Sequence, residues 1–228
     1  MQRTTWVTTW ILLFSIAGCD YPSARFKSSF YPIQSAIPEL KQPVSSLKSN
    51  SELPASTVNA GGDLWSRLQR ADTHYIVLMR HALAPGTGDP ANFQLADCST
   101  QRNLSDEGRS QARRTGETFR QRGVAVNRVL SSQWCRCLET AELMDIGNVE
   151  PFSALNSFFR DRTTGPDQTA QVREFMLESQ DTPGVTVMIT HAVNVSALTG
   201  AGASSGEMVV ITVNDQNQLE VVGQIEAL

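Results

Sequence analysis

The chain has 228 residues, of which 40% are hydrophobic, and a formal net charge of −4. This length and composition suffice for one core of ordinary size, and they exclude a chain that is disordered throughout and a membrane protein with many spans. The acidic balance does not favour nucleic acid, which usually requires a basic patch, so we expect no nucleic-acid partner.

The N-terminal segment has the features of an export signal. Arg3 precedes an apolar stretch, Trp6 to Ala17, that is too short to span a bilayer comfortably. The stretch runs into Gly18 and Cys19 and resembles a bacterial lipobox, in which cleavage leaves the cysteine as a lipid-modified N-terminus. We therefore predict a signal peptide over residues 1–18, lipidation of Cys19, and a membrane-anchored location in the bacterial cell envelope, facing the periplasm or the exterior. The alternatives are an ordinary signal peptide with a chance cysteine, or a buried helix.

Residues 19–60 are rich in serine and proline and have no sustained apolar period. Such a segment cannot bury enough surface to offset its ordering entropy, so we interpret it as a tether. The alternative is an extended arm packed on the domain. The folded domain is predicted over residues 61–228.

Within that domain, strand-like and helix-like patterns alternate. Ser105 is typical of a helix N-cap, and Gly123 of a helix end. Helical patterns cover residues 105–122, 133–144, 167–178 and 191–198, and strand patterns cover 75–79, 126–130, 149–152, 185–189, 208–213 and 219–222, the last two as a hairpin. The alternation predicts an α/β fold, a three-layer α/β/α sandwich with a mainly parallel central sheet.

Export would place the remaining cysteines in a compartment that permits disulfides. Cys135 and Cys137 are separated by one residue, so their side chains point apart in a strand and diverge around a helix. We therefore expect a bridge from Cys98 to either Cys135 or Cys137. The alternative is three free buried thiols.

Polar groups follow three of the predicted strands at the point where each strand ends. Arg80 and His81 follow the first, Arg136 lies in the turn after the second, and His191 follows another. In open α/β sheets, ligands collect at the carboxyl ends of the strands. The coincidence predicts one site built from these four side chains.

The residue types suit a phosphoryl group. An imidazole can attack phosphorus and form a phosphohistidine, and arginines offer fixed donors to the phosphoryl oxygens. All three lysines precede residue 61, so every fixed cation of the domain is an arginine, the side chain best suited to bidentate phosphate contacts. This chemistry requires no metal and no cofactor.

Four ordered motifs between Tyr75 and Gly200 carry a more specific signal. They are Leu78-Met79-Arg80-His81-Ala82; Arg102-Asn103-Leu104-Ser105 with Gly108, Gln111 and Ala112; Ser131-Ser132 with Arg136 and Thr140-Ala141; and Thr190-His191 with Asn194 and Leu198-Thr199-Gly200. Together they resemble branch 1 of the histidine phosphatase superfamily, the group that contains cofactor-dependent phosphoglycerate mutase. Ala82 stands where glycine is commoner in that family.

The resemblance implies a phosphatase in which His81 is the nucleophile, while Arg80, Arg136 and His191 bind the transferred phosphoryl group. It also implies secondary contacts with the substrate from Thr87 and Arg102. The substrate class that we expect is a phosphorylated small molecule or a glycolipid of the envelope, and we expect the enzyme to act as a monomer. Mutase activity is disfavoured, because an exported protein lacks access to cytosolic bisphosphoglycerate.

One departure from the family concerns the proton donor. Many members carry a glutamate in the segment after the second helix, where this chain has Ser157, and the other branch places an aspartate where this chain has Ala192. The leaving oxygen must be protonated by another group or must leave without help. By motif position the candidates are Asp89 and Asp161, each of which is otherwise a loop cap or an ion-pair partner.

Two competing hypotheses remain. A metal site would need His74 and His81 together, but a whole strand of roughly 23 Å separates them, so we expect no metal ligands. A binding module that recognises a phosphorylated envelope component, with little or no turnover, is the second alternative, because the usual acid is absent.

Overall fold

The computed structural model describes residues 60–70 and 72–228. The predicted signal peptide, Cys19 and nearly all of the predicted tether therefore lie outside the described residues. None of the helices described is long and apolar enough to cross a membrane.

A six-stranded sheet forms the centre of the domain, in the order β3-β2-β4-β1-β5-β6. Its strands are β1 (His74–Arg80), β2 (Val126–Ser131), β3 (Val149–Pro151), β4 (Gly184–Thr190), β5 (Met208–Val213) and β6 (Leu219–Ile225). The first four are parallel to one another, whereas β5 is antiparallel to β1 and to β6. The predicted mainly parallel sheet with a C-terminal hairpin is confirmed.

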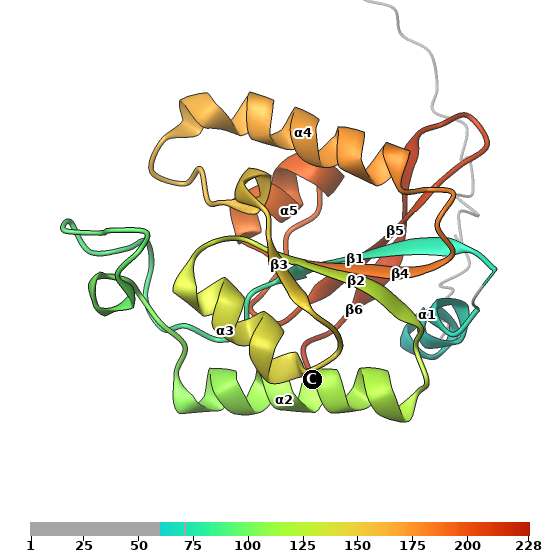
Figure 1. The fold of residues 1–228 in the computed structure, drawn as a ribbon, viewed down its shortest axis with the longest axis horizontal. Helices are drawn as coiled ribbons and strands as arrows, with labels where there is room; N and C mark the ends of the chain where they lie inside the picture. The colour runs from blue at the N-terminus through green and yellow to red at the C-terminus, as the bar shows by residue number, and fades with distance from the viewer. Residues whose placement is uncertain (1–59, 71) are drawn as a thin grey trace, which may run out of the picture. The chain divides into compact units, whose positions relative to one another are not determined.

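Helices cover both faces of this sheet (Figure 1). They are α1 (Ala60–Leu68), α2 (Asp106–Gln121), α3 (Cys135–Met144), α4 (Gly165–Glu178) and α5 (Ala192–Thr199). In Figure 1, α2 and α3 lie below the sheet, and α4 and α5 lie above it. The arrangement is the predicted three-layer sandwich.

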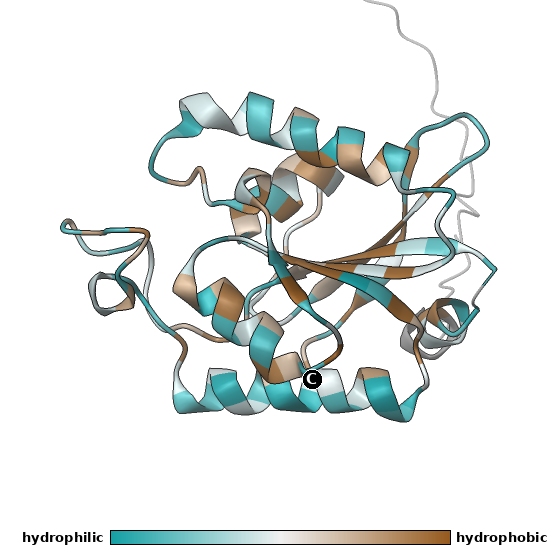
Figure 2. Cartoon of the chain, in the orientation of Figure 1, coloured by the Kyte–Doolittle hydropathy of each residue, from teal (hydrophilic) through white to brown (hydrophobic). Residues whose placement is uncertain are grey.

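Two hydrophobic clusters fill the spaces between the layers, and β1 contributes to both. Val77 and Met79 pack with residues of α1, α2 and α3, while Ile76 and Leu78 pack with residues of α4 and α5. Successive side chains of a strand point to opposite faces, so a strand covered on both sides is apolar along its whole length. Figure 2 shows the strands as predominantly hydrophobic and α2 as largely hydrophilic.

Helix α2 begins and ends as its sequence predicts. The Ser105 hydroxyl accepts a hydrogen bond of 3.0 Å from the Gly108 amide, and Asp106 and Glu107 occupy the first turn. These groups satisfy a free amide and complement the positive end of the helix. Gly123 follows the last turn with a φ of 65°, a conformation that glycine adopts without strain.

Candidate active site

The register between β1 and β4 brings the two predicted site histidines together. Arg80 pairs with Thr190, and the backbone amide of His81 donates to the Thr190 carbonyl at 2.9 Å. His81 and His191 therefore leave the sheet side by side, and their ring centroids lie 5.5 Å apart. Both rings, with Arg80 and Arg136, line one pocket of about 230 Å³, which has the scale of a small-molecule site.

His81 is held as a neutral imidazole with one free nitrogen. Its Nδ1 lies 2.7 Å from the Ala82 carbonyl oxygen, which can only accept, so Nδ1 carries the hydrogen. Nε2 makes no hydrogen bond to any described residue and keeps its lone pair. Burial, followed by the charge of Arg136, lowers the pKa of His81 to about 3. At neutral pH this nitrogen is therefore ready to act as a nucleophile.

His191 is fixed in the opposite tautomer. Its Nδ1 lies 3.3 Å from Nη2 of Arg136, which can only donate, so Nδ1 is the acceptor. Its Nε2 donates to the Ser132 hydroxyl at 2.9 Å, and that hydroxyl donates to Oδ1 of Asn156. Burial, then the nearby Arg136 and His81, hold the pKa of His191 well below its usual value. Both histidines are therefore uncharged at neutral pH.

The two arginines predicted to bind phosphate have unused donors. Arg80 donates from Nη1 to the Ala203 carbonyl at 3.0 Å, and Arg136 is 2% exposed. The Nε atoms of both side chains are buried and have no hydrogen-bond partner among the described residues. Buried donors are nearly always paired in folded proteins, so unpaired ones beside a pocket indicate a missing acceptor. An oxyanion is the acceptor that suits a guanidinium best.

Asp89 does not have the role of proton donor predicted for it. Its carboxylate accepts from Nη1 and Nη2 of Arg136 at 2.7 and 3.2 Å, from Nε1 of Trp134 at 3.1 Å and from the Arg102 amide at 3.1 Å. Burial alone would raise the pKa of Asp89, but the hydrogen bonds and charge of Arg136 outweigh it, and the pKa is lowered. Asp89 is therefore an ionised partner of Arg136 and carries no proton that it could give to a leaving group.

Asp161, the other candidate, lies outside the pocket. Its carboxylate caps the short 3-10 helix Arg162–Thr164 by accepting from the amide and hydroxyl of Thr163. These hydrogen bonds lower its pKa, so this group is ionised as well. Ser157 does line the pocket. Among the described residues that line it, no carboxyl group remains free to act as an acid.

The secondary predictions have mixed outcomes. Thr87 and Arg102 both line the pocket. The guanidinium of Arg102, however, donates to the carbonyls of Gly88 and Ala84 and so closes the loop that follows β1. His74 begins β1, at the end of the strand away from the pocket, where its Nε2 lies 3.1 Å from the Thr186 hydroxyl. Over the range that the structure describes, no three His, Cys, Asp or Glu side chains are grouped to hold a metal.

Three aromatic residues that the sequence did not predict as site residues also line the pocket. Phe93 stacks on Trp134 with centroids 5.0 Å apart, and Trp134 meets the edge of His191 at 5.4 Å. Phe159 also lines the pocket and is 46% exposed. Isolated aromatic residues in a sequence are most often core residues, so no pattern distinguished these three.

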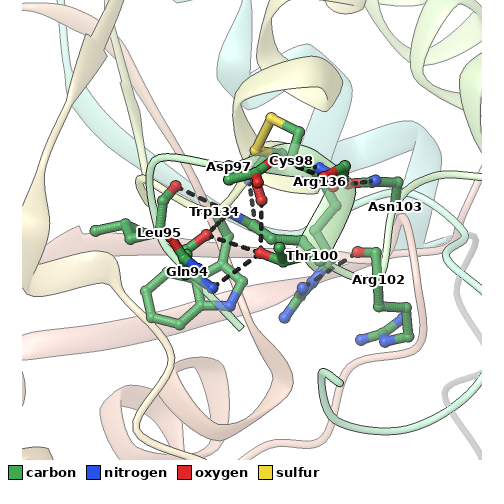
Figure 3. The surroundings of a disulfide bond; sticks show 12 residues. Gln94, Leu95, Asp97, Cys98, Thr100, Arg102, Asn103, Trp134 and Arg136 are labelled. Carbon is green, nitrogen blue, oxygen red and sulfur yellow. Dashed lines mark hydrogen bonds between the residues drawn. A yellow bond between two sulfur atoms is a disulfide. The ribbon is translucent and has the colours of Figure 1, made fainter. Parts of the chain in front are cut away.

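A disulfide between Cys98 and Cys135 joins the loop after β1 to the start of α3, which is one of the two predicted pairings (Figure 3). Two hydrogen bonds reinforce the junction: the Cys135 amide donates to the Gln101 side chain at 3.0 Å, and Arg136 donates to the Arg102 carbonyl at 3.3 Å. The loop and Arg136 are therefore fixed to each other.

Cys137 is the free cysteine of the described residues. Its Sγ lies 3.5 Å from Nε2 of His191, within the buried layer under the site. Burial raises the pKa of this thiol to about 12. It is therefore protonated and does not compete with His81 as a nucleophile.

Comparison with known proteins agrees with this geometry. A model of the histidine phosphatase superfamily (branch 1) matches residues 76–195. The chain belongs to this superfamily. No match to a protein of curated function was found.

Two solved phosphatase structures with TM-scores of 0.50 share the fold, and a third was also found. A mycobacterial glucosyl-3-phosphoglycerate phosphatase in complex with VO3 is 15% identical with a TM-score of 0.50, over 68% of this chain and 99% of its own. A phosphoserine phosphatase from Entamoeba histolytica, in complex with 3-phosphoglyceric acid, is 11% identical with a TM-score of 0.50, over 68% and 98%. The protein histidine phosphatase SixA, in complex with tungstate, is 18% identical with a TM-score of 0.48, over 67% and 96%.

Replacing Asp89 with alanine is expected to destabilise the superfamily domain by about 3–5 kcal/mol, because Arg136 would keep a buried charge without its partner. Urea unfolding measures the change. Asp97→Ala is the matched control, since Asp97 lies in the same loop and its side chain caps an exposed turn at Ser99, so its loss should cost much less. Equal losses for the two variants would contradict the assigned role.

Removing the disulfide with Cys98→Ser and Cys135→Ser together is expected to lower stability by about 3–4 kcal/mol, since the bridge closes a loop with a sequence separation of 37. Thermal unfolding with and without a thiol reductant measures this. Reductant should lower the melting temperature of the wild type and leave that of the double variant unchanged. If the melting temperature of the wild type does not change when the disulfide is fully reduced, the disulfide does not contribute to stability.

Proposed function

We propose that this chain hydrolyses phosphate monoesters through a phosphohistidine intermediate at His81. The observation that carries the proposal is the free Nε2 of His81 beside two buried arginines whose Nε donors have no acceptor. Nε2 attacks phosphorus, the bond to the leaving oxygen breaks, and water then attacks the phosphohistidine to release inorganic phosphate and neutral His81.

Arg80, Arg136 and His191 hold the phosphoryl oxygens in this proposal. The arginines supply fixed positive charge in a site shielded from water, where it is most effective. A phosphate dianion beside His191 would raise the pKa of that imidazole, because an opposite charge favours the protonated form. His191 would then donate a hydrogen bond to the phosphoryl group as the substrate binds. No step in this sequence uses a metal ion.

In this proposal the leaving group departs without an acid from the described residues of the pocket. Asp89 and Asp161 are both ionised and engaged elsewhere, and Ser157 cannot supply a carboxylic proton. Esters whose leaving group is a weak base, such as aryl phosphates, are therefore the substrates that the site can cleave fastest. A phosphorylated small molecule or glycolipid of that kind is our proposed substrate class.

The location that we propose is the bacterial cell envelope, with a monomeric domain anchored through lipid on Cys19. The support is the sequence from Trp6 to Cys19, which resembles a signal peptide with a lipobox. Acyl chains contribute roughly 0.8 kcal/mol for each buried CH2, so several chains on one cysteine suffice to hold a domain on a membrane.

A phosphate-binding module with little turnover is the second candidate. The observation that favours it is the absence of a protonated carboxyl group among the described pocket residues. The binding contacts of such a module would be the same arginines and His191. Only the chemistry at His81 separates the two hypotheses.

His81→Asn is expected to lower kcat/KM for 4-nitrophenyl phosphate by about a thousandfold or more, because the nucleophile is lost. His74→Asn is the matched control at the other end of the same strand and should retain activity. Rapid quenching in alkali should trap phosphohistidine in the wild type and not in His81→Asn. A wild type that neither turns over this ester nor forms phosphohistidine would leave the binding-module hypothesis standing.

Ser157→Glu is expected to raise turnover of alkyl phosphates relative to aryl phosphates by about tenfold or more, because general acid catalysis typically contributes at least that much when the leaving group is poor. The ratio of kcat/KM for ethyl and 4-nitrophenyl phosphate measures the effect. Ser157→Gln has a similar size and no acidic proton, and its ratio should match the wild type. Equal ratios in the glutamate and glutamine variants would show that an acid at this position does not limit the reaction.

A further inference from the structure

Four arginines line the pocket, and three of them are engaged within the protein. Arg136 is paired with Asp89, and Arg102 donates to two carbonyls of its own loop. Arg80 donates to the Ala203 carbonyl and lies in the favourable field of Glu207. Arg80 and Arg136 belong to the proposed phosphoryl site, and Arg102 belongs to the loop that supports it.

Arg160, the fourth, lies at the rim and has no comparable partner. Its one hydrogen bond is a long contact of 3.4 Å from Nη1 to the Pro90 carbonyl. Within residues 60–70 and 72–228, no carboxylate lies within 4.0 Å of it, and its neighbour Asp161 is engaged in capping a turn. Arg160 therefore lines the pocket with a positive charge that no carboxylate among the described residues neutralises.

Aromatic side chains line the same pocket as Arg160. Phe159 lines the pocket with nearly half of its surface exposed, and the guanidinium of Arg162 lies over its ring at 5.5 Å from the centroid. Phe93 and Trp134 also line the pocket as a stacked pair. Exposed aromatic side chains that line a pocket indicate a ligand with an apolar part that packs against them.

We propose that the leaving group of the substrate presents a flat apolar ring to these aromatic residues and carries an anionic substituent that binds Arg160. Arg160 is then a specificity-determining residue, separate from the groups that hold the transferred phosphoryl. The inference rests on the proposed phosphatase function, since it assigns the phosphoryl group to the inner arginines. The substrate class is a small aryl or similarly flat phosphate monoester with a second acidic group.

Binding of two phosphonates to the full chain tests the inference without requiring turnover. The probes are 4-carboxyphenylphosphonate and its neutral counterpart 4-carbamoylphenylphosphonate, which have nearly the same shape and differ by one charge. Isothermal titration calorimetry of the wild type is expected to give a preference of roughly 1.5- to fivefold for the carboxylate, the range for an exposed ion pair. The preference should shrink in 0.5 M NaCl, because salt screens exposed charges.

Arg160→Gln should abolish this preference and leave the affinity for the carbamoyl probe unchanged, and Arg160→Lys should retain part of it. Arg113→Gln is the control, since Arg113 is an exposed arginine of α2 that does not line the pocket or contact its aromatic residues. It should keep the wild-type preference. Equal affinities of the wild type for the two probes, no binding of either, or equal losses in the two glutamine variants would overturn the inference.

Turnover of 4-nitrophenyl phosphate, which has no acidic substituent, tests the proposed function separately. If that ester is hydrolysed in a His81-dependent reaction while Arg160→Gln leaves the probe preference intact, the phosphatase proposal stands and the inference about Arg160 fails. If the ester is not hydrolysed but the preference depends on Arg160, the inference about the ligand stands for a binding module.

Discussion

Arg80 pairs with Thr190 across β1 and β4, and the amide of His81 extends that pairing by donating to the Thr190 carbonyl. Every other feature of the site is arranged around this register. It places the two histidines next to each other at the carboxyl end of the sheet, and the parallel pairing of β2 with β4 brings Ser132 and the start of α3 to the same edge. A shift of one residue would point each side chain to the other face of the sheet. The hydrophobic clusters on both faces oppose such a shift, so the core maintains the geometry of the site.

The charge states of the histidines, the arginines and Asp89 in the site are complementary. Burial keeps both histidines neutral, while Asp89 and backbone carbonyls accept hydrogen bonds from some of the donors of the arginines. A buried ion pair of this kind adds little net stability compared with an apolar pair, since desolvation offsets most of the attraction. Its value here is in orientation: two contacts fix the plane of the Arg136 guanidinium, while its Nε stays free. The same carboxylate holds Trp134 and the loop after β1, so one group aligns an arginine, an aromatic ring and a loop.

Much of this fold could be predicted from sequence because its elements carry local signals. The Ser105 cap, the glycine after α2 and the apolar runs of β1 and β4 depend on neighbouring residues and on burial, which a sequence displays directly. The four central site residues were predictable because each lies close to the carboxyl end of a strand. Arg80 ends β1, His81 and His191 follow β1 and β4, and Arg136 lies in the first turn of α3 and not in the turn predicted for it. The positions of Asp89, Phe159 and Arg160 were not predictable, because the loops that carry them have no repeating period. Asp89, for example, is placed by hydrogen bonds with Trp134 and Arg136, which are far away in the chain.

The missing acid and the anchored loop have a common consequence. Where a carboxylic acid protonates the leaving oxygen, part of the barrier is lowered by proton transfer; where none is available, positioning and electrostatic stabilisation must lower nearly all of it. Those effects depend on how rigidly the donors are held, since small displacements of a charged group weaken its interaction with the developing charge. The loop after β1 carries the counter-ion of Arg136 and is tied to α3 by a disulfide and by hydrogen bonds from both Cys135 and Arg136. In the proposed mechanism this bracing acts on Arg136, one of the two arginines assigned to the phosphoryl group, so the disulfide contributes to its positioning as well as to the stability of the domain.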